Sequence, residues 1–390
     1  MLERPAMRIL MVSDDFLPNP GGIAAHVYEL SCALAEFGHR VDLIVGYDQR
    51  HALRTISLPE GVQILQQRGF AWNSRGYLRS ALASARAIER ARQAEVYDVC
   101  HWHSLVWESW AVAYGARGLP RVFTNHSSGF LRRARSPLRR RFQLRPILQL
   151  ADAVIAPSSE LLERSVDTGY PRERVRYIAN GVDTRTFAPG PPDPELRRSY
   201  GLAPSDRVLI APRRLDPKNG IDVLVRAVAE IARTTPGLKL LLVGDGGQRA
   251  ALEALVGELG VAENVVFCGS QPRERMVHFL RLAEIAVLPS RMEAVSLAGL
   301  EALAVGLPLV GSRVGGIPEF VRDGDNGLLV PPDDPRALAQ ALGSLLEDEP
   351  RRRALAARAR PSIEDDFSWR VTARQTLEVY AAARERHRAA

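Results

Sequence analysis

The chain has 390 residues, of which 46% are hydrophobic and 25% are charged. This composition excludes disordered, collagen-like and coiled-coil chains, and the length suggests two domains. Its three cysteines, Cys32, Cys100 and Cys268, are far apart and form no Cys-x-x-Cys pair, so we expect neither disulfides nor a structural zinc site. The apolar runs are too short to span a bilayer and the N-terminus lacks a signal-peptide pattern, so we expect a cytoplasmic protein.

The net charge of +7 is distributed unevenly along the chain. Residues 1–190 contain 25 basic and 18 acidic residues, whereas residues 191–390 contain 27 of each, so the whole excess lies in the first half. Of the 52 basic residues, only Lys218 and Lys239 are lysines. A genome rich in G and C would explain the preference for arginine without any function.

Short apolar runs predict strands, and the longer segments between them predict helices. In the first half these elements are strands at 7–13, 40–46, 98–103, 121–126, 151–156 and 175–180, and helices at 22–37, 77–94, 106–117 and from 159. In the second half they are strands at 207–211, 238–243, 264–268, 284–288 and 308–311, and helices at 221–233, 248–259, 273–282 and 295–305. This alternation is typical of βαβ units in parallel sheets.

A proline-rich segment at 188–204 divides the two halves and contains five prolines in 17 residues. Such a composition predicts a stiff, exposed connector. We therefore expect a first domain at 1–187, a linker at 188–204 and a second domain at 205–368. The tail at 369–390 is expected to be a helix that can pack back on the first domain.

Two loops that follow predicted strands carry groups suited to phosphate. The first ends in Gly21 and Gly22 at a helix start, where backbone N–H groups and the helix dipole favour an anion. It lacks the Gly-x-Gly-x-x-Gly pattern, so no dinucleotide cofactor is expected. The second places Arg214 and Lys218 on a loop that enters a helix, and both cations suit a pyrophosphate. The alternatives are a plain turn and a solvated basic loop.

A third segment contains two glutamates, Glu293 and Glu301. A spacing of eight residues would place both on one face of a helix. A carboxylate near a helix start can accept hydrogen bonds from sugar hydroxyls, and the loop amides of Ser296 and Leu297 would bind phosphate oxygens. The alternative is an acid at a helix start followed by a surface acid.

These motifs, in this order, resemble the retaining glycosyltransferases of family 4. The resemblance extends over about 320 residues and is carried by Gly21-Gly22, the segment 36–41, Thr124-Asn125-His126, the segment 180–183, Arg214-Leu215 with Lys218 and Gly220, the segment 244–246, the two glutamates, Gly306-Leu307-Pro308 and the segment 315–319. It implies an α/β protein of the GT-B fold. In that fold two doubly wound Rossmann-like domains face each other across a cleft, the first on the acceptor side and the second binding the nucleotide sugar.

The resemblance also implies roles for individual residues. The implied catalytic set is His126 beside the transferred sugar, Arg214 and Lys218 on the departing pyrophosphate, and Glu293 on the sugar hydroxyls. The implied donor-binding set is Gly22, Arg214, Lys218, Glu293, Ser296, Leu297 and Glu301, with Gly22 on the β-phosphate and Glu301 on the ribose. Positive groups on the departing phosphates would stabilise the charge separation of sugar transfer, so no metal ion is expected.

The implied activity is transfer of a hexose or hexosamine, with retention, from a nucleotide-diphosphate sugar to a glycan, lipid-linked or small-molecule acceptor. Bacterial envelope or exopolysaccharide synthesis is the implied setting, and the nucleotide sugar is a co-substrate rather than a cofactor. Two alternatives are a sugar-nucleotide epimerase of the same fold and a catalytically silent GT-B binding subunit. The second stays open because the segment 293–296 reads Glu-Ala-Val-Ser where the family usually has Glu-Gly-Phe-Gly, so that Val295 replaces an aromatic residue.

Two further features lie in the first half. His101 and His103 have the spacing of a metal-binding pair, but no third ligand is evident and we predict no metal site. The segment 131–145 contains seven arginines: Arg132, Arg133, Arg135, Arg139, Arg140, Arg141 and Arg145. We expect it to contact an anionic membrane at its inner face, or a phosphorylated acceptor. A solvated basic helix is the alternative, and nucleic acid is not expected because no aromatic platform accompanies the arginines.

Overall fold

The computed structural model describes residues 5–17, 22–45, 56–65, 77–105, 107–294 and 296–389. Gly21 and Val295, both singled out from the sequence, lie outside the described residues. The chain forms two units, one made of Met1–Asn180 with Trp369–Ala390 and the other of Gly181–Ser368. The division therefore falls before the expected boundary at 187, and the segment 188–204 belongs to the second unit.

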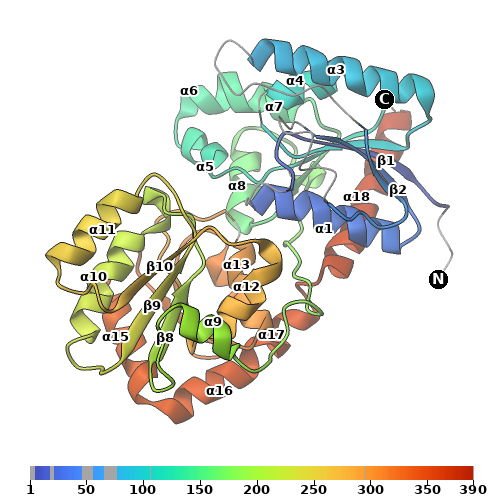
Figure 1. Ribbon diagram of the computed structural model, residues 1–390. Coiled ribbons are helices and arrows are strands. Elements are labelled where there is room, and N and C mark those ends of the chain that lie inside the picture. The colour runs from blue at the N-terminus through green and yellow to red at the C-terminus, as the bar shows by residue number, and fades with distance from the viewer. Residues whose placement is uncertain are drawn as a thin grey trace. The chain divides into compact units, whose positions relative to one another are not determined.

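The first unit is built on a sheet of seven parallel strands in the order β3-β2-β1-β4-β5-β6-β7 (Figure 1). The strands are β1 Arg8–Ser13, β2 Arg40–Val45, β3 Val62–Ile64, β4 Val99–Trp102, β5 Arg121–Thr124, β6 Ala153–Ala156 and β7 Val175–Tyr177. The helices are α1 Gly22–Glu36, α3 Tyr77–Ala94, α4 Trp107–Gly115, α5 Ser128–Ala134, α6 Pro137–Arg139, α7 Arg145–Leu148, α8 Ser159–Asp167 and α18 Trp369–Ala389, with a π-helix η1 at Arg140–Leu144 and a 3₁₀ turn η2 at Arg172–Arg174. Ile9, Leu10 and Met11 of β1 are fully buried, as expected for a strand covered by helices on both faces.

Helix α18 is the last element of the chain but belongs to the first unit, where it lies beside α1 (Figure 1). Arg370 pairs with Glu36 of α1 at 3.2 Å, and Arg384 pairs with Asp98 at 2.8 Å. Tyr380 is fully buried against the sheet and contacts Nδ1 of His101 at 2.7 Å. The tail therefore completes the core of the first unit.

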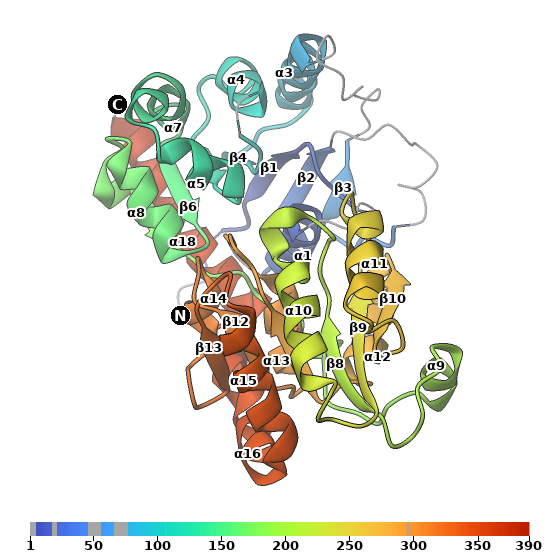
Figure 2. The ribbon, with the colours of Figure 1, turned by 90° about the vertical axis from the view of Figure 1, so that its left-hand side faces the viewer.

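The second unit contains six parallel strands in the order β10-β9-β8-β11-β12-β13, with helices on both faces (Figure 2). The strands are β8 Arg207–Ala211, β9 Leu238–Val243, β10 Val265–Gly269, β11 Ile285–Leu288, β12 Leu309–Ser312 and β13 Gly327–Val330. The helices are α9 Pro194–Ser199, α10 Ile221–Ile231, α11 Arg249–Glu258, α12 Arg273–Leu280, α13 Leu297–Ala304, α14 Ile317–Phe320, α15 Pro335–Glu347, α16 Glu349–Ala359 and α17 Pro361–Glu364, with a 3₁₀ turn η3 at Pro217–Asn219.

Both sheets are doubly wound, which confirms the fold class expected from the sequence. In each sheet the strand order reverses beside the first strand, between β1 and β4 in one unit and between β8 and β11 in the other. Ligands of open α/β sheets bind outside the carboxyl ends of the strands at such a reversal. The loops that follow these four strands are therefore the places where a site is built.

Two local differences from the expected elements have clear causes. The proline-rich segment contains helix α9, because Asp193 caps its start by accepting the N–H groups of Glu195 and Leu196 at 2.9 and 3.1 Å, and Pro194 fits the first helical position. Helix α13 begins at Leu297 rather than 295, because Ser296 caps it by accepting the N–H of Gly299 at 3.2 Å.

Candidate active site

Arg213 organises the reversal point of the second unit, where β8 and β11 pair in parallel. Its guanidinium donates to the hydroxyls of Ser290 at 2.7 Å and Ser296 at 3.2 Å, and to the amide oxygen of Asn219 at 3.1 Å. It also pairs with the carboxylate of Glu293, and both charged side chains are almost buried, at 10% and 11% exposure. This cluster fixes the place of the first predicted glutamate.

The sequence motifs predict no role for Arg213. Arg214 and Lys218, the residues predicted to bind the pyrophosphate, are exposed. The neighbouring Asn219 is buried and donates to the carbonyl of Arg214 at 2.7 Å. The signal that would have found Arg213 is its place two residues after the end of β8, a strand whose last four residues are buried. The structure therefore brings two exposed cations and one almost buried arginine to the same loop.

Glu301 lies on α13 and is buried, with its carboxylate 2.9 Å from Nη1 of Arg273 on α12. Burial raises the pKa of Glu301, and the charge of Arg273 opposes that shift. Glu293 precedes the helix, so the expectation that both glutamates share one helical face is wrong. The two acids instead belong to separate ion pairs, each with its own arginine.

Glycines shape the loops around this cluster. Gly220 has φ +65°, and a Cβ added there would overlap the carbonyl oxygen of Pro289. Gly315 has φ +51°, and a Cβ there would overlap the carbonyl oxygen of Glu293. Only glycine is tolerated where a left-handed backbone also passes this close to another chain segment. The backbone that carries Glu293 is therefore held between two glycine loops.

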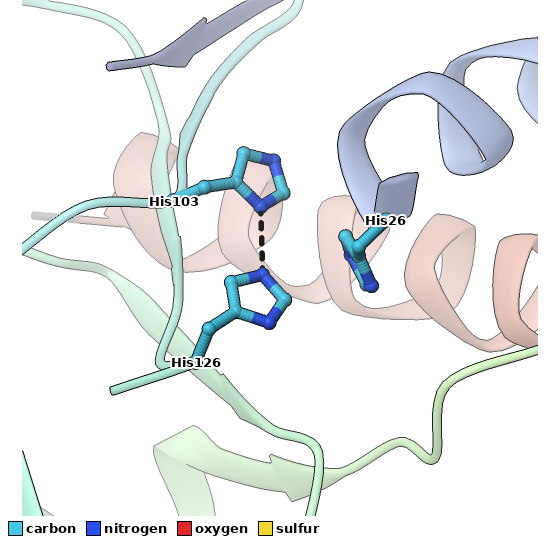
Figure 3. Close-up of side chains that lie close together, drawn as sticks. All are labelled: His26, His103 and His126. Carbon is cyan, nitrogen blue, oxygen red and sulfur yellow. Dashed lines mark hydrogen bonds between the residues drawn. The ribbon is translucent and has the colours of Figure 1, made fainter. Parts of the chain in front are cut away.

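His126 lies two residues beyond β5 in the first unit and faces two other histidines (Figure 3). Its Nε2 is 3.1 Å from Nδ1 of His103, which follows β4. The ring of His26, from α1, lies edge-on to that of His126 with ring centroids 4.3 Å apart. Burial lowers the pKa of His26 to about 4 and holds those of His103 and His126 well below the usual value. All three rings are therefore neutral at pH 7.

His101, the first member of the predicted histidine pair, has a different environment. Its Nε2 is 2.7 Å from the hydroxyl of Thr124, and its Nδ1 is 2.7 Å from that of Tyr380. Both ring nitrogens are therefore occupied by hydrogen bonds. The cluster uses His26 in its place, which sequence spacing did not suggest.

Two carboxyl groups, that of Glu108 buried and that of Asp14 half-buried, lie at the reversal point of the first unit and were not predicted from the sequence. Asp14 follows β1 and accepts a hydrogen bond from the hydroxyl of Ser104, and Glu108 lies in the first turn of α4. Burial holds the pKa of Glu108 well above its ordinary value, and the negative charge of Asp14 raises it further. A protonated carboxyl beside a hydroxyl can both donate to and accept from a polyhydroxyl ligand.

Gly22 is the first residue of α1, as expected. Apart from its chain neighbours and its own helix backbone, no described residue lies within 4 Å of a Cβ added at Gly22. Its backbone N–H is at the start of a helix, a position that suits an anion.

The arginine-rich segment forms α5 and then an almost continuous helical run from Pro137 to Leu148. Leu138 and Phe142 protrude from this run and are 71% and 67% exposed. The arginines that flank them, Arg139 and Arg141, are exposed as well. Over the stretches of chain that the structure describes, no helix is both long and apolar enough to cross a membrane.

Two family models match the chain. "Glycosyltransferase Family 4" matches residues 20–186, and "Glycosyl transferases group 1" matches residues 192–361. The chain is 36% identical over 314 residues to the D-inositol 3-phosphate glycosyltransferase of Nocardia farcinica, covering 76% of this chain and 69% of that protein. It is 34% identical to the GDP-mannose-dependent alpha-(1-6)-phosphatidylinositol monomannoside mannosyltransferase of Mycolicibacterium smegmatis, covering 64% and 67% of the two chains.

Among solved structures, the sucrose-phosphate synthase of Thermosynechococcus elongatus superimposes with a TM-score of 0.82 at 25% identity, covering 96% of this chain and 98% of that one. The match extends through both units, and so do the two family models taken together. The expected GT-B fold is thereby confirmed, and the chain belongs to the glycosyltransferases of family 4.

Proposed function

We propose that this glycosyltransferase moves a hexose or hexosamine, with retention, from a nucleotide-diphosphate sugar and without a catalytic metal ion. The observation that carries the proposal is the buried cluster at the reversal point of the second unit, where Arg213 holds Glu293 and Arg273 holds Glu301. Two carboxylates held in separate ion pairs can bind two separate sets of hydroxyls. The exposed Arg214 and Lys218 lie on the preceding loop, and their positive charges suit a pyrophosphate.

The proposed roles follow from charge and burial. Glu293 accepts hydrogen bonds from the donor sugar, and Glu301 accepts those of the ribose. Arg214 and Lys218 neutralise the departing diphosphate, with the N–H groups at Ser296, Leu297 and Gly22 as further phosphate donors. His126, neutral and half-buried beyond the end of β5, would lie beside the transferred sugar. These assignments rest on the family resemblance, supported by the positions of the residues at strand ends.

The division of labour between the two glutamates predicts opposite effects of two substitutions. Glu301→Gln should weaken binding of the bare nucleoside diphosphate at least about tenfold, or ~1.4 kcal/mol, because the ribose loses a charged acceptor. Glu293→Gln should leave that binding within about twofold and impair sugar transfer instead. Isothermal titration calorimetry of both variants with UDP, GDP and ADP measures the first effect, and turnover measures the second. The reverse pattern of affinities would refute the assignment.

The chain contains one Asp-x-Asp sequence, a pair of carboxylates that would suggest a metal site. Its surroundings agree with metal independence. Asp323 pairs with Arg313 at 2.9 Å and Asp325 pairs with Arg358 at 2.9 Å, so both carboxylates are engaged with arginine. The cationic loop at 213–218 supplies positive charge for the departing diphosphate in place of a metal ion.

We therefore expect turnover to persist in excess EDTA at no less than about half its untreated value. The assay compares initial rates before and after chelation, with and without added Mg²⁺ or Mn²⁺. Loss of activity in EDTA that either cation restores would overturn the metal-independent mechanism.

Product analysis tests the activity itself. A panel of UDP-, GDP- and ADP-sugars, scored by thermal shift and slow donor hydrolysis, identifies the donor. With that donor, a glycoside of retained configuration is expected. An epimerised nucleotide sugar would instead show an epimerase, and binding without any product would show a silent binding subunit.

For the acceptor we propose a glycan, lipid-linked or small-molecule compound of the bacterial envelope or of an exopolysaccharide, bound by the first unit. The names of the two relatives include an inositol phosphate and a phosphatidylinositol mannoside, both of which bear phosphate. The whole positive excess of this chain lies in residues 1–190, which suits an anionic acceptor. No nucleic acid is proposed as a partner.

The run at 137–148 has the composition of a segment that rests on an anionic membrane. Its exposed Leu138 and Phe142 would enter the headgroup region while Arg132, Arg133, Arg139, Arg140 and Arg141 remain near the phosphates. We propose peripheral binding of a cytoplasmic protein to the inner face of the membrane through this run.

Replacing Arg139 and Arg141 with serine should reduce sedimentation with vesicles of anionic lipid at least about threefold, because each arginine near a charged surface contributes about 1 kcal/mol. Binding by the unaltered chain should fall as salt is raised, since the attraction is screened. The control replaces Arg351 and Arg353, two exposed arginines of the second unit at the same spacing. Equal, negligible binding to anionic and neutral vesicles would show that the arginines form only a solvated surface.

A further inference from the structure

Three imidazoles converge in the first unit, from α1 and from the carboxyl ends of β4 and β5 (Figure 3). His26 and His103 are buried, and His126 is half-buried. One ring nitrogen each of His26, His103 and His126 lies within 4.8 Å of the other two. Nδ1 of His103 and Nε2 of His126 are 3.1 Å apart. Two imidazole nitrogens bound to one tetrahedral Zn²⁺ at ~2.0–2.1 Å lie about 3.3 Å from each other. This pair is therefore already at coordination spacing, and only the third ring has to move inward.

The hydrogen bond of His26 orients it as a ligand. Its Nδ1 is 2.9 Å from the amide oxygen of Asn180, and that oxygen can only accept. The proton is therefore on Nδ1, and the lone pair is on Nε2. Metal-bound histidines usually donate their second ring N–H in this way, which fixes both tautomer and ring orientation.

Two ring nitrogens of the cluster are buried without a partner. Among the described residues, no group forms a hydrogen bond with Nε2 of His26 or with Nε2 of His103. The side chains of these residues are 2% and 1% exposed. Buried polar atoms are normally paired, so the unpaired lone pair on Nε2 of His26 indicates a missing electrophile, which a bound cation would supply. Nε2 of His103 is not a ligand atom in this arrangement, because Nδ1 is the atom of that ring that faces His126.

We propose that His26, His103 and His126 form a binding site for one divalent transition metal ion, with Zn²⁺ the best match. Three neutral imidazoles suit Zn²⁺, Co²⁺ and Ni²⁺, whereas Mg²⁺ and Ca²⁺ require oxygen ligands that this cluster does not offer. The ion replaces the proton shared by His103 and His126, and that proton moves to the outer nitrogen of one ring. Three protein ligands leave a fourth position for water or a ligand atom. The ion has no assigned part in sugar transfer.

The test uses the full chain, free of any histidine tag, treated with EDTA and then freed of the chelator. Zn²⁺ is titrated in competition with a chromophoric chelator, and Co²⁺ is titrated while the visible spectrum is recorded. We expect one equivalent of each metal per chain and the intense visible bands of four-coordinate Co²⁺. His26→Gln and His103→Gln should each lower the affinity for Zn²⁺ at least about tenfold. The control is His278→Gln, which removes an exposed histidine of α12 in the other unit.

The Co²⁺ spectrum of the unaltered chain tests whether the three histidines bind a metal ion, even if a variant fails to fold. A weak spectrum typical of six-coordinate Co²⁺, or no stoichiometric binding of Zn²⁺, would overturn the proposal. An unchanged affinity in a folded His103→Gln variant would also overturn it. In either case the three rings would be a hydrogen-bonded cluster only. Neither measurement involves donor or acceptor, so its outcome is independent of the proposed function.

Discussion

Replacing Gly315 with alanine is expected to lower the free energy of unfolding of the second unit by about 2–4 kcal/mol and to abolish binding of nucleoside diphosphate. The added Cβ would overlap the carbonyl oxygen of Glu293, and φ is +51° at this position. A side chain at this position is therefore unfavourable for two reasons: the left-handed backbone strains it, and it overlaps the carbonyl oxygen of Glu293. The loop that carries Glu293 must shift to relieve the overlap. Ser296 and Leu297, whose N–H groups are proposed to bind the diphosphate, lie three and four residues further along the chain and would shift with it.

Gly324→Ala is the matched control for this prediction. Gly324 also has a left-handed backbone, with φ +78°, but none of the described residues lies within 4 Å of a Cβ added there. Gly324→Ala should lower the free energy of unfolding only by the backbone strain, about 1 kcal/mol, and leave nucleotide binding unchanged. Urea unfolding and calorimetry measure both quantities for both variants. Equal losses of stability would mean that the close approach to Glu293 contributes nothing.

Much of the scaffold could be predicted because it depends on local sequence. The run Ile-Leu-Met-Val at 9–12 is apolar at every position, which indicates a strand covered on both faces, and β1 is such a strand. The short β3 was missed, because three residues are too few to show a period. Helix α9 was missed because the prolines around it masked a helix start at Asp193.

The candidate site could be predicted only in part, because its decisive contacts join distant segments. The motif pattern located the loops of Glu293 and Glu301, but it gave no sign that Arg213, 80 residues from Glu293, would be its partner. Neighbouring strands bring His103 and His126 together, as the rule for strand ends would suggest. His26 joins them only because α1 packs with the face that carries His26 towards the sheet, and this packing depends on tertiary structure.

Replacing Arg213 with alanine is expected to lower turnover at least about a hundredfold, or ~2.7 kcal/mol in the barrier, and to lower the free energy of unfolding by about 3 kcal/mol. The side chain of Glu293 is only 11% exposed, so its carboxylate would be left buried without its cationic partner. The hydroxyls of Ser290 and Ser296 would also lose a donor. Arg213→Lys should restore part of the stability but less of the turnover, since one ammonium cannot reproduce the planar fork.

A double-mutant cycle separates the ion pair from the rest of the cluster. Glu293→Gln combined with Arg213→Ala should cost much less than the sum of the two single changes, because the buried charges disappear together. The control is Arg291→Ala on the loop that carries Glu293. The partners of Arg291, Asp222 and Asp333, are 32% and 58% exposed, so about 1 kcal/mol or less should be lost. Additive losses in the cycle would show that Arg213 acts through its serine and asparagine contacts. Glu293 would then owe its position to the backbone beside Gly315 rather than to its ion pair.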